Sequence, residues 1–304
     1  MLLPYLRQLL AKGETHLSVT TEAREVLRKM YKGEINLSGE ARAKEPAAAQ
    51  AKTDSGGGAE PKQATQAEPM IARPTFGGAA KPKIEHVAKP VPQGQTPEEK
   101  LASLRDLAEH WPAFRDLGSF RKTLVFSGGP VTADLMLIGE VPGQHDEQKR
   151  EPFAGPAGEK LEQILKAMGL SRDRVYLTNI CKFRPALPGQ TSNNRPPRPE
   201  EIAHSLPFVL SEIEIVQPKV IIALGAAASH ALLQNSDSFD DLRSKWHQVN
   251  GVATRVSHHP SFLLLADKDA LAEKRKIWED MLVVMEKLGL PISDKQKGFF
   301  LPKK

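Results

Sequence analysis

Residues 134–140 read DLMLIGE, a run of apolar side chains that follows an aspartate and ends in glycine and glutamate. Three more runs of apolar or β-branched residues occur along the chain, and each has the length of a buried strand. They are VYLTNI at 175–180, KVIIALG at 219–225 and ATRVS at 253–257. Apolar runs without polar alternation are typical of a parallel sheet that is covered on both faces.

Helical patterns lie between these runs. Residues 202–216 and 226–233 have the composition of buried helices, and a third helix has apolar residues at spacings of three and four. The residues that mark this third helix are Leu161, Ile164, Leu165 and Met168. The alternation of strands and helices predicts an α/β fold, a three-layer α/β/α sandwich with a central, mainly parallel four-stranded sheet.

The composition divides the chain into four parts. Residues 38–95 are rich in Ala, Lys, Gln, Pro and Gly and hold few residues able to form a core, which predicts a disordered linker. Residues 1–37 have leucines at helical spacing and predict a small helical hook. The hook either binds a partner protein, or folds back on the chain or is loosely ordered. The rest is a main domain at 96–290 and a C-terminal tail at 291–304.

Overall composition limits the class of protein. The 304 residues, 40% of them hydrophobic, suffice for one sizeable core plus appendages. A net charge of +5 is compatible with a polyanionic partner and also with many ordinary proteins. The single cysteine, Cys181, excludes an internal disulfide framework and favours a reducing compartment. Since the first residues lack a basic leader and a long apolar run, we expect a location in the bacterial cytoplasm or nucleoid, away from membranes.

Polar residues follow each predicted strand. Glu140 and the turn 141–143 come after the first strand, Asn179 closes the second, Gly225 closes the third, and HHPS at 258–261 follows the fourth. In an open parallel sheet, ligands bind at the carboxyl ends of the strands. We therefore expect a carboxylate, an amide and an imidazole on one rim of the sheet.

These segments occur in an order that resembles a known family. They are GEVPGQHDEQKREPFAGPAG at 139–158, VYLTNICKFRP at 175–185, NRPPRPEEI at 194–202, PKVIIALGAAA at 218–228, LRSKW at 242–246 and HHPSFLL at 258–264. Over residues 101–288, their content, order and nearly all spacing resemble the iron-sulfur (family 4) uracil-DNA glycosylases. The resemblance implies a uracil-DNA glycosylase-like fold. It also implies a monomeric DNA repair enzyme that flips deoxyuridine out of single- or double-stranded DNA and hydrolyses its N-glycosidic bond.

The resemblance also implies catalytic residues. Cleavage of this bond develops positive charge on the sugar and negative charge on uracil, so the site needs an anion near the sugar and a donor near the base. Glu140 and Asp146 match acidic positions of the first motif, and either would orient water or stabilise the sugar. His259 would donate to the charged uracil oxygen. Outside this context, Glu140 would be a surface carboxylate, Asp146 a loop charge or helix cap, and His259 a structural histidine.

The base-binding residues are implied in the same way. Phe153 would stack on the extruded base, and Asn179 would read its edge with a donor and an acceptor. Gly139 and Val141 would line the same site. Taken alone, Phe153 would be a core residue and Asn179 a turn residue. No metal is expected at the pair 258–259, because adjacent histidines seldom point at one ion.

Basic residues near these loops are candidates for phosphate contacts, which position DNA without reading its sequence, although some will be ordinary solvated charges. They are Lys182, Arg184, Arg195, Arg198, Arg243 and Lys245. A short apolar segment after His259 is expected to insert a wedge into the gap left by the flipped base, unless it packs as a helix against the core. This segment consists of Ser261, Phe262, Leu263 and Leu264.

The chain departs from the family at the metal cluster. Family 4 enzymes hold a [4Fe-4S] cluster with four cysteines, whereas this chain has one cysteine, so we expect no cofactor. Phe183 occupies the third cysteine position and Ser205 the fourth, while the first two fall near Pro112 and Arg115. Apolar packing is expected to take over the structural role of the cluster. The residues expected in this packing are Trp111, Phe114 and Phe183.

Two further departures concern the rim that would face DNA. The loop 186–193 is longer than in the relatives, and Leu265 stands where they often carry arginine. A second interpretation therefore stays open beside the active enzyme, namely a catalytically weakened member of the same superfamily that binds DNA or a partner protein.

Overall fold

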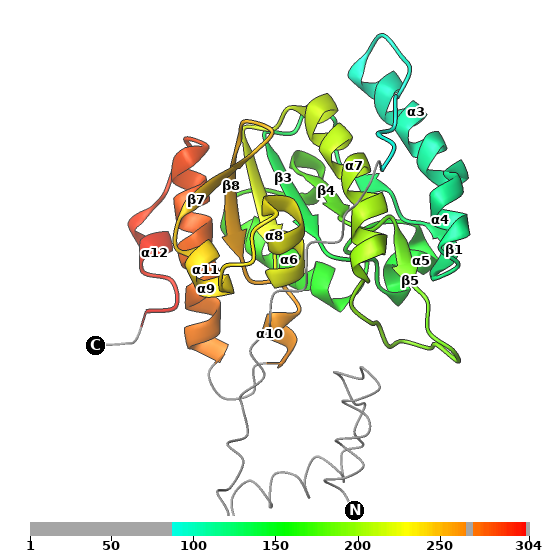
Figure 1. Cartoon of the computed structure of the whole chain (residues 1–304). Coiled ribbons are helices and arrows are strands. Elements are labelled where there is room, and N and C mark those ends of the chain that lie inside the picture. The colour runs from blue at the N-terminus through cyan, green and yellow to red at the C-terminus, as the bar shows by residue number, and fades with distance from the viewer. Residues whose placement is uncertain (1–86, 266–269, 302–304) are drawn as a thin grey trace, which may run out of the picture. The chain divides into compact units, whose positions relative to one another are not determined.

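The central sheet has six strands in the order β2-β4-β3-β6-β8-β7 in a computed structural model that describes residues 87–265 and 270–301 (Figure 1). Four of these strands lie in the middle and run parallel. They are β4 (Tyr176–Asn179), β3 (Leu135–Gly139), β6 (Val220–Leu224) and β8 (Val252–Ser257). They coincide with the four apolar runs of the sequence, so the predicted parallel sheet is confirmed.

Two antiparallel strands extend this sheet at its edges. Strand β2 (Ser127–Gly128) pairs with β4, and β7 (Trp246–Val249) pairs with β8. The first has only two residues and the second reads WHQV, so neither has the apolar pattern of a buried strand. The expectation of four strands is therefore corrected to six, with the four parallel strands at the centre.

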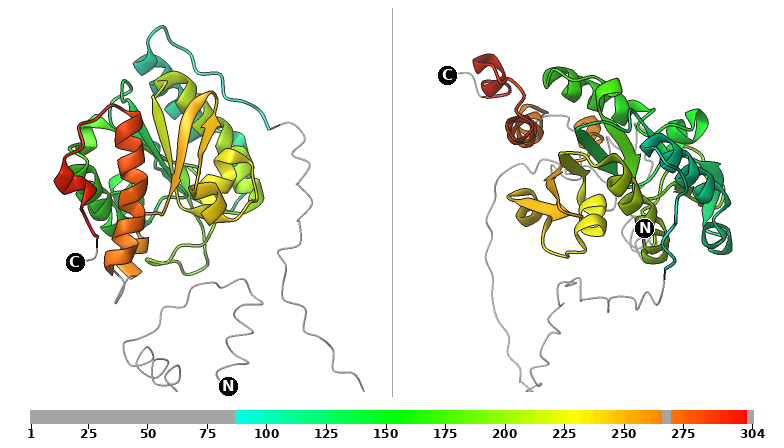
Figure 2. Two further views of the ribbon diagram at one scale, coloured as in Figure 1. Left: turned by 90° about the vertical axis from the view of Figure 1, so that its left-hand side faces the viewer. Right: turned by 90° about the horizontal axis from the view of Figure 1, so that it is seen from above.

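Helices cover both faces of the sheet, as Figure 2 shows. These helices are α6 (Pro156–Ala167), α7 (Pro199–Val216), α8 (Ala226–Leu233) and α11 (Ala270–Lys287). Successive side chains of β3 point to opposite faces, so Met136 and Ile138 join the core under α7 and α8. Leu135 and Leu137 join the core under α6 and α11. The predicted three-layer sandwich is therefore present.

A smaller core lies beside the sheet. It is formed by α7 and four further elements. These are α3 (Pro97–His110), α4 (Pro112–Asp116), β1 (Phe120–Leu124) and β5 (Phe183–Pro185). Helix α3 begins at Thr96, whose side chain accepts from the backbone of Glu99 while Glu99 accepts in return. This reciprocal cap fixes the start of α3, while Lys89 and Pro90 before it already contact the domain, Lys89 through an ion pair with Glu214.

The remaining elements are α5 (Gln144–Lys149), the 3₁₀ turn η1 (Arg172–Arg174), α9 (Phe239–Arg243), α10 (Phe262–Leu265) and α12 (Asp294–Lys297). Residues 291–301, expected to be part of a tail, pack against the main domain. The side-chain amide of Gln296 donates to the carbonyl of Ala167 at 2.9 Å, and the Trp278 indole donates to the carbonyl of Gln296 at 2.6 Å.

The expected hook at 1–37 and most of the expected linker at 38–95 lie outside the described residues. Among the helices that the structure describes, none has both the length and the apolar character needed to cross a membrane.

Candidate active site

Gly139 and Asn179 lie side by side at the carboxyl edge of the sheet, because β3 and β4 pair in that register. A Cβ atom built on Gly139 would lie 2.3 Å from Oδ1 of Asn179 and 2.8 Å from Cζ of Phe153. Glycine is therefore the residue that lets the amide and the aromatic ring approach each other. Val141 is half-buried two residues further on.

Asn179 carries a buried side-chain amide at this edge. The residue is only 2% exposed, and its Nδ2 makes no hydrogen bond within the described part of the chain. A buried donor without a partner costs about 1 to 3 kcal/mol, so such groups call for an explanation. A bound molecule with an acceptor oxygen would satisfy this donor.

Other residues contact the backbone of Phe153 and so hold its ring beside Asn179. Phe153 has a φ of +55°, a conformation that is uncommon for a residue with a side chain. The Arg172 guanidinium donates to the carbonyl of Phe153 at 3.0 Å and to the carbonyl of Pro152. A Cβ atom on Gly158 would lie 1.7 Å from the carbonyl oxygen of Phe153, so Gly158 leaves room for this turn.

The two candidate carboxylates have different environments. Oδ2 of Asp146 accepts from the backbone N–H of Gly143 at 2.9 Å, and Oδ1 accepts from that of Ala154 at 2.7 Å. Asp146 thus caps α5 and ties it to the segment that carries Phe153. Glu140 makes no side-chain hydrogen bond to any described residue, and burial raises the pKa of its carboxyl above the ordinary value. The geometry therefore favours Glu140 as the carboxylate with free oxygens.

His259 lies on the other side of the same edge, after β8. Its Nδ1 accepts from the backbone N–H of Ser261 at 3.2 Å, and the Ser261 hydroxyl is 2.8 Å from the same nitrogen. Because Nδ1 is an acceptor, the proton of the neutral ring resides on Nε2. Burial lowers the pKa of His259 to about 4, so the ring is neutral near pH 7 and offers one N–H donor.

The rings of His259 and Phe153 face each other, with centroids 5.8 Å apart and planes inclined by 28°. Gly225, which closes β6, lies directly behind His259. Four of the residues that the sequence places on one rim, Gly139, Phe153, Asn179 and His259, therefore gather at one place, with Glu140 next to Gly139 along the chain.

Only part of the segment 261–264, the expected wedge, has a side chain that is free to enter DNA. Phe262 stacks on His258 with centroids 4.4 Å apart, and both Phe262 and Leu263 pack against the core. Leu264 is 46% exposed and is the apolar side chain of this segment that faces solvent. The expectation that Phe262 and Leu263 insert into DNA is corrected accordingly, because their side chains are engaged in packing, whereas Leu264 is free to insert.

Two of the basic residues expected to bind phosphates are buried. Lys182 is 0% exposed, forms an ion pair with Glu212, and donates to the hydroxyl of Thr178 at 2.6 Å and to the carbonyl of Asn179 at 3.0 Å. Arg184 pairs with Glu147 and is equally enclosed. The expectation that Lys182 contacts DNA is therefore wrong, and Arg184, at 1% exposed, offers almost no surface for such a contact. Lys182 instead fixes the backbone of Asn179 from behind.

Three of the other basic residues differ in how many ion pairs and hydrogen bonds they already make within the fold. Arg195 pairs with Glu201 and donates to three backbone carbonyls, and Arg243 pairs with the buried Asp280 at 2.7 Å. Both are largely shielded from solvent. Lys245 is more than half exposed, and its nearest carboxylate among the described residues is 3.9 Å away. Of these three, Lys245 has the freest charge.

The region that would hold a cluster in the resembling family is filled with aromatic rings. Phe114 of α4 lies 5.4 Å from Phe183 and 5.3 Å from Phe208, and Trp111 lies 5.1 Å from Phe208, measured between centroids. This is the apolar packing expected around Trp111, Phe114 and Phe183. Cys181 belongs to a different core, where burial raises the pKa of its thiol to about 12. These residues do not fit an iron-sulfur cluster.

Metal ligands do not gather elsewhere in the described residues either, since no group of three or more His, Cys, Asp or Glu side chains there is arranged to hold an ion. Two residues of the site were missed in the sequence, namely Arg172 and Gly158, while Gly225 was placed at the rim without a role. No sequence pattern indicated Arg172, because it lies 19 residues along the chain from Phe153, to whose carbonyl it donates. The glycines lie inside the quoted motifs, where a requirement for glycine is a usual sign of close approach.

Comparison with known proteins finds a matching family and several relatives. The family model described as "Uracil DNA glycosylase superfamily" matches residues 126–282. The chain is 33% identical over 156 residues to a type-4 uracil-DNA glycosylase of Pyrobaculum aerophilum, covering 49% of this chain and 76% of the relative. It is 34% identical over 165 residues to that of Thermotoga maritima, covering 53% and 81%. For the type-4 enzyme of Archaeoglobus fulgidus the identity is 30% over 174 residues, covering 54% and 84%.

Proposed function

The chain belongs to the uracil-DNA glycosylase superfamily, and on that premise we propose that it is a DNA repair enzyme that hydrolyses the N-glycosidic bond of deoxyuridine and releases uracil. The observation that carries this proposal is the meeting of Asn179, Phe153 and His259 at one edge of the sheet, with a buried amide donor that has no partner among the described residues. Uracil has the flat face and the carbonyl oxygens that these three side chains would bind.

Base flipping follows from the depth of this site. Since Asn179 is almost fully buried, a base stacked inside a duplex cannot reach it, so the deoxyuridine has to rotate out of the helix. Leu264 is exposed beside the site and would fill the gap that the base leaves. Single-stranded DNA needs no such wedge, which supports action on both kinds of strand.

Two groups would carry the chemical step. When the bond between C1′ and N1 breaks, the electron pair leaves with uracil, and the Nε2–H of His259 donates to the oxygen on which the negative charge gathers. Glu140 orients a water molecule, which adds its oxygen to C1′ and transfers a proton to the carboxylate. The uracil anion later takes up a proton from solvent. Asp146 serves this reaction indirectly, because it holds the segment that carries Phe153.

Uracil release from labelled oligonucleotides tests this proposal. Single- and double-stranded probes with one uracil are incubated with excess full-length protein, and the abasic product is quantified. His259→Ala should slow excision by roughly a hundredfold, the effect of losing one donor to a developing anion. His110→Ala is the matched control, because His110 is an exposed histidine on α3. A wild-type protein that binds these probes without releasing uracil would instead be a weakened member of the superfamily.

A further inference from the structure

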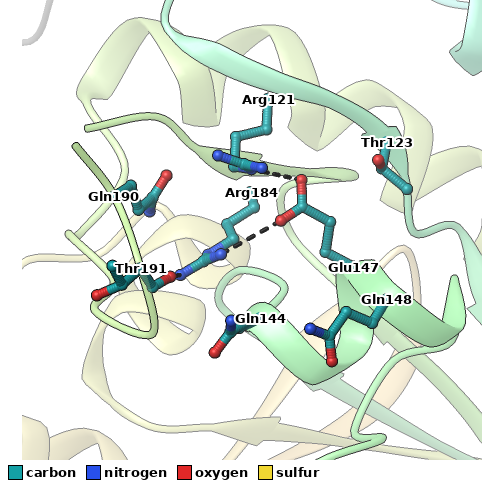
Figure 3. A pocket seen from close by; sticks show the side chains of 8 residues that line it. All are labelled: Arg121, Thr123, Gln144, Glu147, Gln148, Arg184, Gln190 and Thr191. Atoms are coloured by element: carbon teal, nitrogen blue, oxygen red, sulfur yellow. Dashed lines mark hydrogen bonds and ion pairs between the residues drawn. The ribbon is translucent and has the colours of Figure 1, made fainter. Parts of the chain in front are cut away.

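A second polar site lies beside α5, the short helix within the first motif. It is a cavity of about 280 Å³ between α5, the strands β1 and β5, and the loop after β5. Figure 3 shows the carboxylate of Glu147 joined to Arg121 and to Arg184, while Gln144 and Gln148 project from α5. None of the functions described above uses this cavity.

The charges in this cavity do not cancel. Oε1 of Glu147 lies 2.6 Å from Nε of Arg121, and its Oε2 lies 3.2 Å from Nη1 of Arg184 (Figure 3). Two guanidinium groups therefore share one carboxylate, which leaves one positive charge. Arg184 is buried and also donates to Asn194 and to two backbone carbonyls. The side chain of Arg121 is 41% exposed, and its terminal NH₂ groups make no hydrogen bond within the described residues, so the excess charge is available at Arg121.

Neutral donors complete the cavity. Gln144 and Gln148 are four residues apart and thus lie on one face of α5, and Thr191 lines the cavity from the loop after β5. The side-chain amides of both glutamines and the hydroxyl of Thr191 make no hydrogen bond to any described residue. The described residues that line the cavity include no aromatic ring, so a nucleobase would find no surface on which to stack. An oxyanion with several acceptor oxygens suits this lining better.

The cavity is joined to the base site through α5. The same short helix presents Asp146 toward the Phe153 segment and Glu147 toward the cavity. We infer that this cavity binds one phosphodiester group of the DNA strand that carries the deoxyuridine, on one side of the flipped nucleotide. The inference rests on the proposed function for the identity of that strand.

Salt-dependent binding tests this inference without any chemical step. The probe is a fluorescent single strand with one tetrahydrofuran abasic site, and the dissociation constant of the full-length protein is measured at several salt concentrations. Arg121→Gln should weaken binding roughly fivefold at low salt. It should also make the slope of log K against log salt shallower by about 0.7, the contribution of one phosphate on a single strand.

Glu147→Gln changes the same cavity in the opposite direction. It raises the net charge by one, so it should tighten binding to the same probe. Lys219→Gln is the matched control, because Lys219 is an exposed cation that precedes β6, at the amino ends of the strands. The control should leave the affinity and the slope unchanged. Equal slopes for wild type, Arg121→Gln and Glu147→Gln, with all three folded by thermal melting, would overturn the inference.

Neutral linkages locate the contact on the DNA. A methylphosphonate is placed at one position after another around the abasic site, and one position should weaken binding of the wild type. In Arg121→Gln the same position should cause no further loss, because the partner is already gone. Arg121→Gln and wild type responding alike at every position would refute the inference. The abasic probe has no base to remove, so these binding tests do not depend on catalysis. If the protein gives the expected binding results but releases no uracil, only the proposed function is contradicted.

Discussion

Gly225 lies directly against His259, and a Cβ atom built on Gly225 would be only 3.2 Å from the Cβ atom of His259. Gly225 also has a φ of +90°, which other residues rarely adopt. The end of β6 therefore sets the position of the imidazole that follows β8. This contact explains why a residue with no polar side chain belongs to the site.

Gly225→Ala should displace His259 and slow uracil excision by roughly ten- to hundredfold, since a shift of about 1 Å at a catalytic group has effects of this size. Binding to abasic DNA should be unchanged. Gly251→Ala is the control, because Gly251 also has a positive φ, +78°, but a Cβ atom built there would have no described atom within 4 Å. If both variants lose the same activity, backbone strain and not the contact with His259 is responsible.

Asn179→Asp should abolish uracil excision. It replaces the Nδ2 donor, which has no partner among the described residues, with an oxygen that would repel a uracil carbonyl. Binding to abasic DNA should persist, because phosphate contacts supply most of the affinity. Single-turnover excision and abasic-strand binding are measured on the same preparation. Excision at the wild-type rate would mean that Asn179 does not read the base.

Protonation of Glu140 should cause the loss of the single-turnover excision rate at low pH. Burial raises its pKa above 4.5, and only the carboxylate can accept a proton, so the single-turnover rate should fall with a midpoint above pH 4.5 as the pH is lowered. His259 contributes little to this loss, since its pKa is about 4 and it stays neutral over most of that range. A midpoint at or below pH 4.5 would show that Glu140 is not the titrating group.

Glu140→Gln should in addition leave the free energy of unfolding at pH 7 unchanged or higher. Burial favours the protonated form, so the ionised carboxylate of the wild type destabilises the fold at any pH above its folded pKa. Urea denaturation of both proteins at pH 7 measures the difference. A clear loss of stability in Glu140→Gln would indicate that the carboxylate has a structural partner after all.

Arg172→Met should act on the base site through Phe153. Without the guanidinium, the carbonyls of Pro152 and Phe153 lose their donors, and Phe153 can leave its left-handed conformation, which costs on the order of 1 to 3 kcal/mol to hold. The protein concentration for half-maximal single-turnover excision should rise more than the maximal rate falls, and Arg172→Lys should restore part of the effect.

Arg275→Met is the matched control for this variant. Arg275 also donates to two backbone carbonyls, those of Lys297 and Phe299, but these lie in the C-terminal segment. It should lower stability without changing the half-maximal concentration. The same kinetic change in both variants would mean that Arg172 has only a general structural role.

Phe183→Ala should reduce the free energy of unfolding by roughly 3 to 5 kcal/mol, as expected for removal of a buried ring. Phe183 packs against Phe114 and Phe120 in the small core beside the sheet. Phe300→Ala, at a half-buried position near the C-terminus, should reduce it less. Urea denaturation gives both values. A loss below about 1 kcal/mol for Phe183→Ala would show that this ring does not hold the small core together.

The parallel centre of the sheet could be predicted because its strands are short runs rich in apolar and β-branched residues, and the polar residues of the rim followed from where those runs end. The edge strands could not be predicted, since β2 has only two residues and β7, which reads WHQV, contains no apolar run. Edge strands depend on pairing with a neighbour more than on their own composition.

The roles of the charged residues needed the structure. Lys182 and Glu212 are 30 positions apart, so no local pattern indicates that they neutralise each other inside the core. Likewise, Glu140 and Asp146 are both carboxylates of one motif, and only the backbone amides that surround Asp146 distinguish them. A basic residue next to a motif is available to a phosphate only when its side chain is exposed and keeps donors that the fold does not use.

The aromatic packing between α4, β5 and α7 has a consequence for how this chain reaches its active form in the cell. Elements that four thiolates would hold together in the resembling family are joined here by Phe114, Phe183 and Phe208. Carbon rings need no delivery of iron and no sulfur donor, and peroxide or superoxide has no thiolate-bound iron to extract from this part of the fold. The fold of this part of the protein should therefore not depend on the supply of iron, and a chelator should leave its thermal melting unchanged.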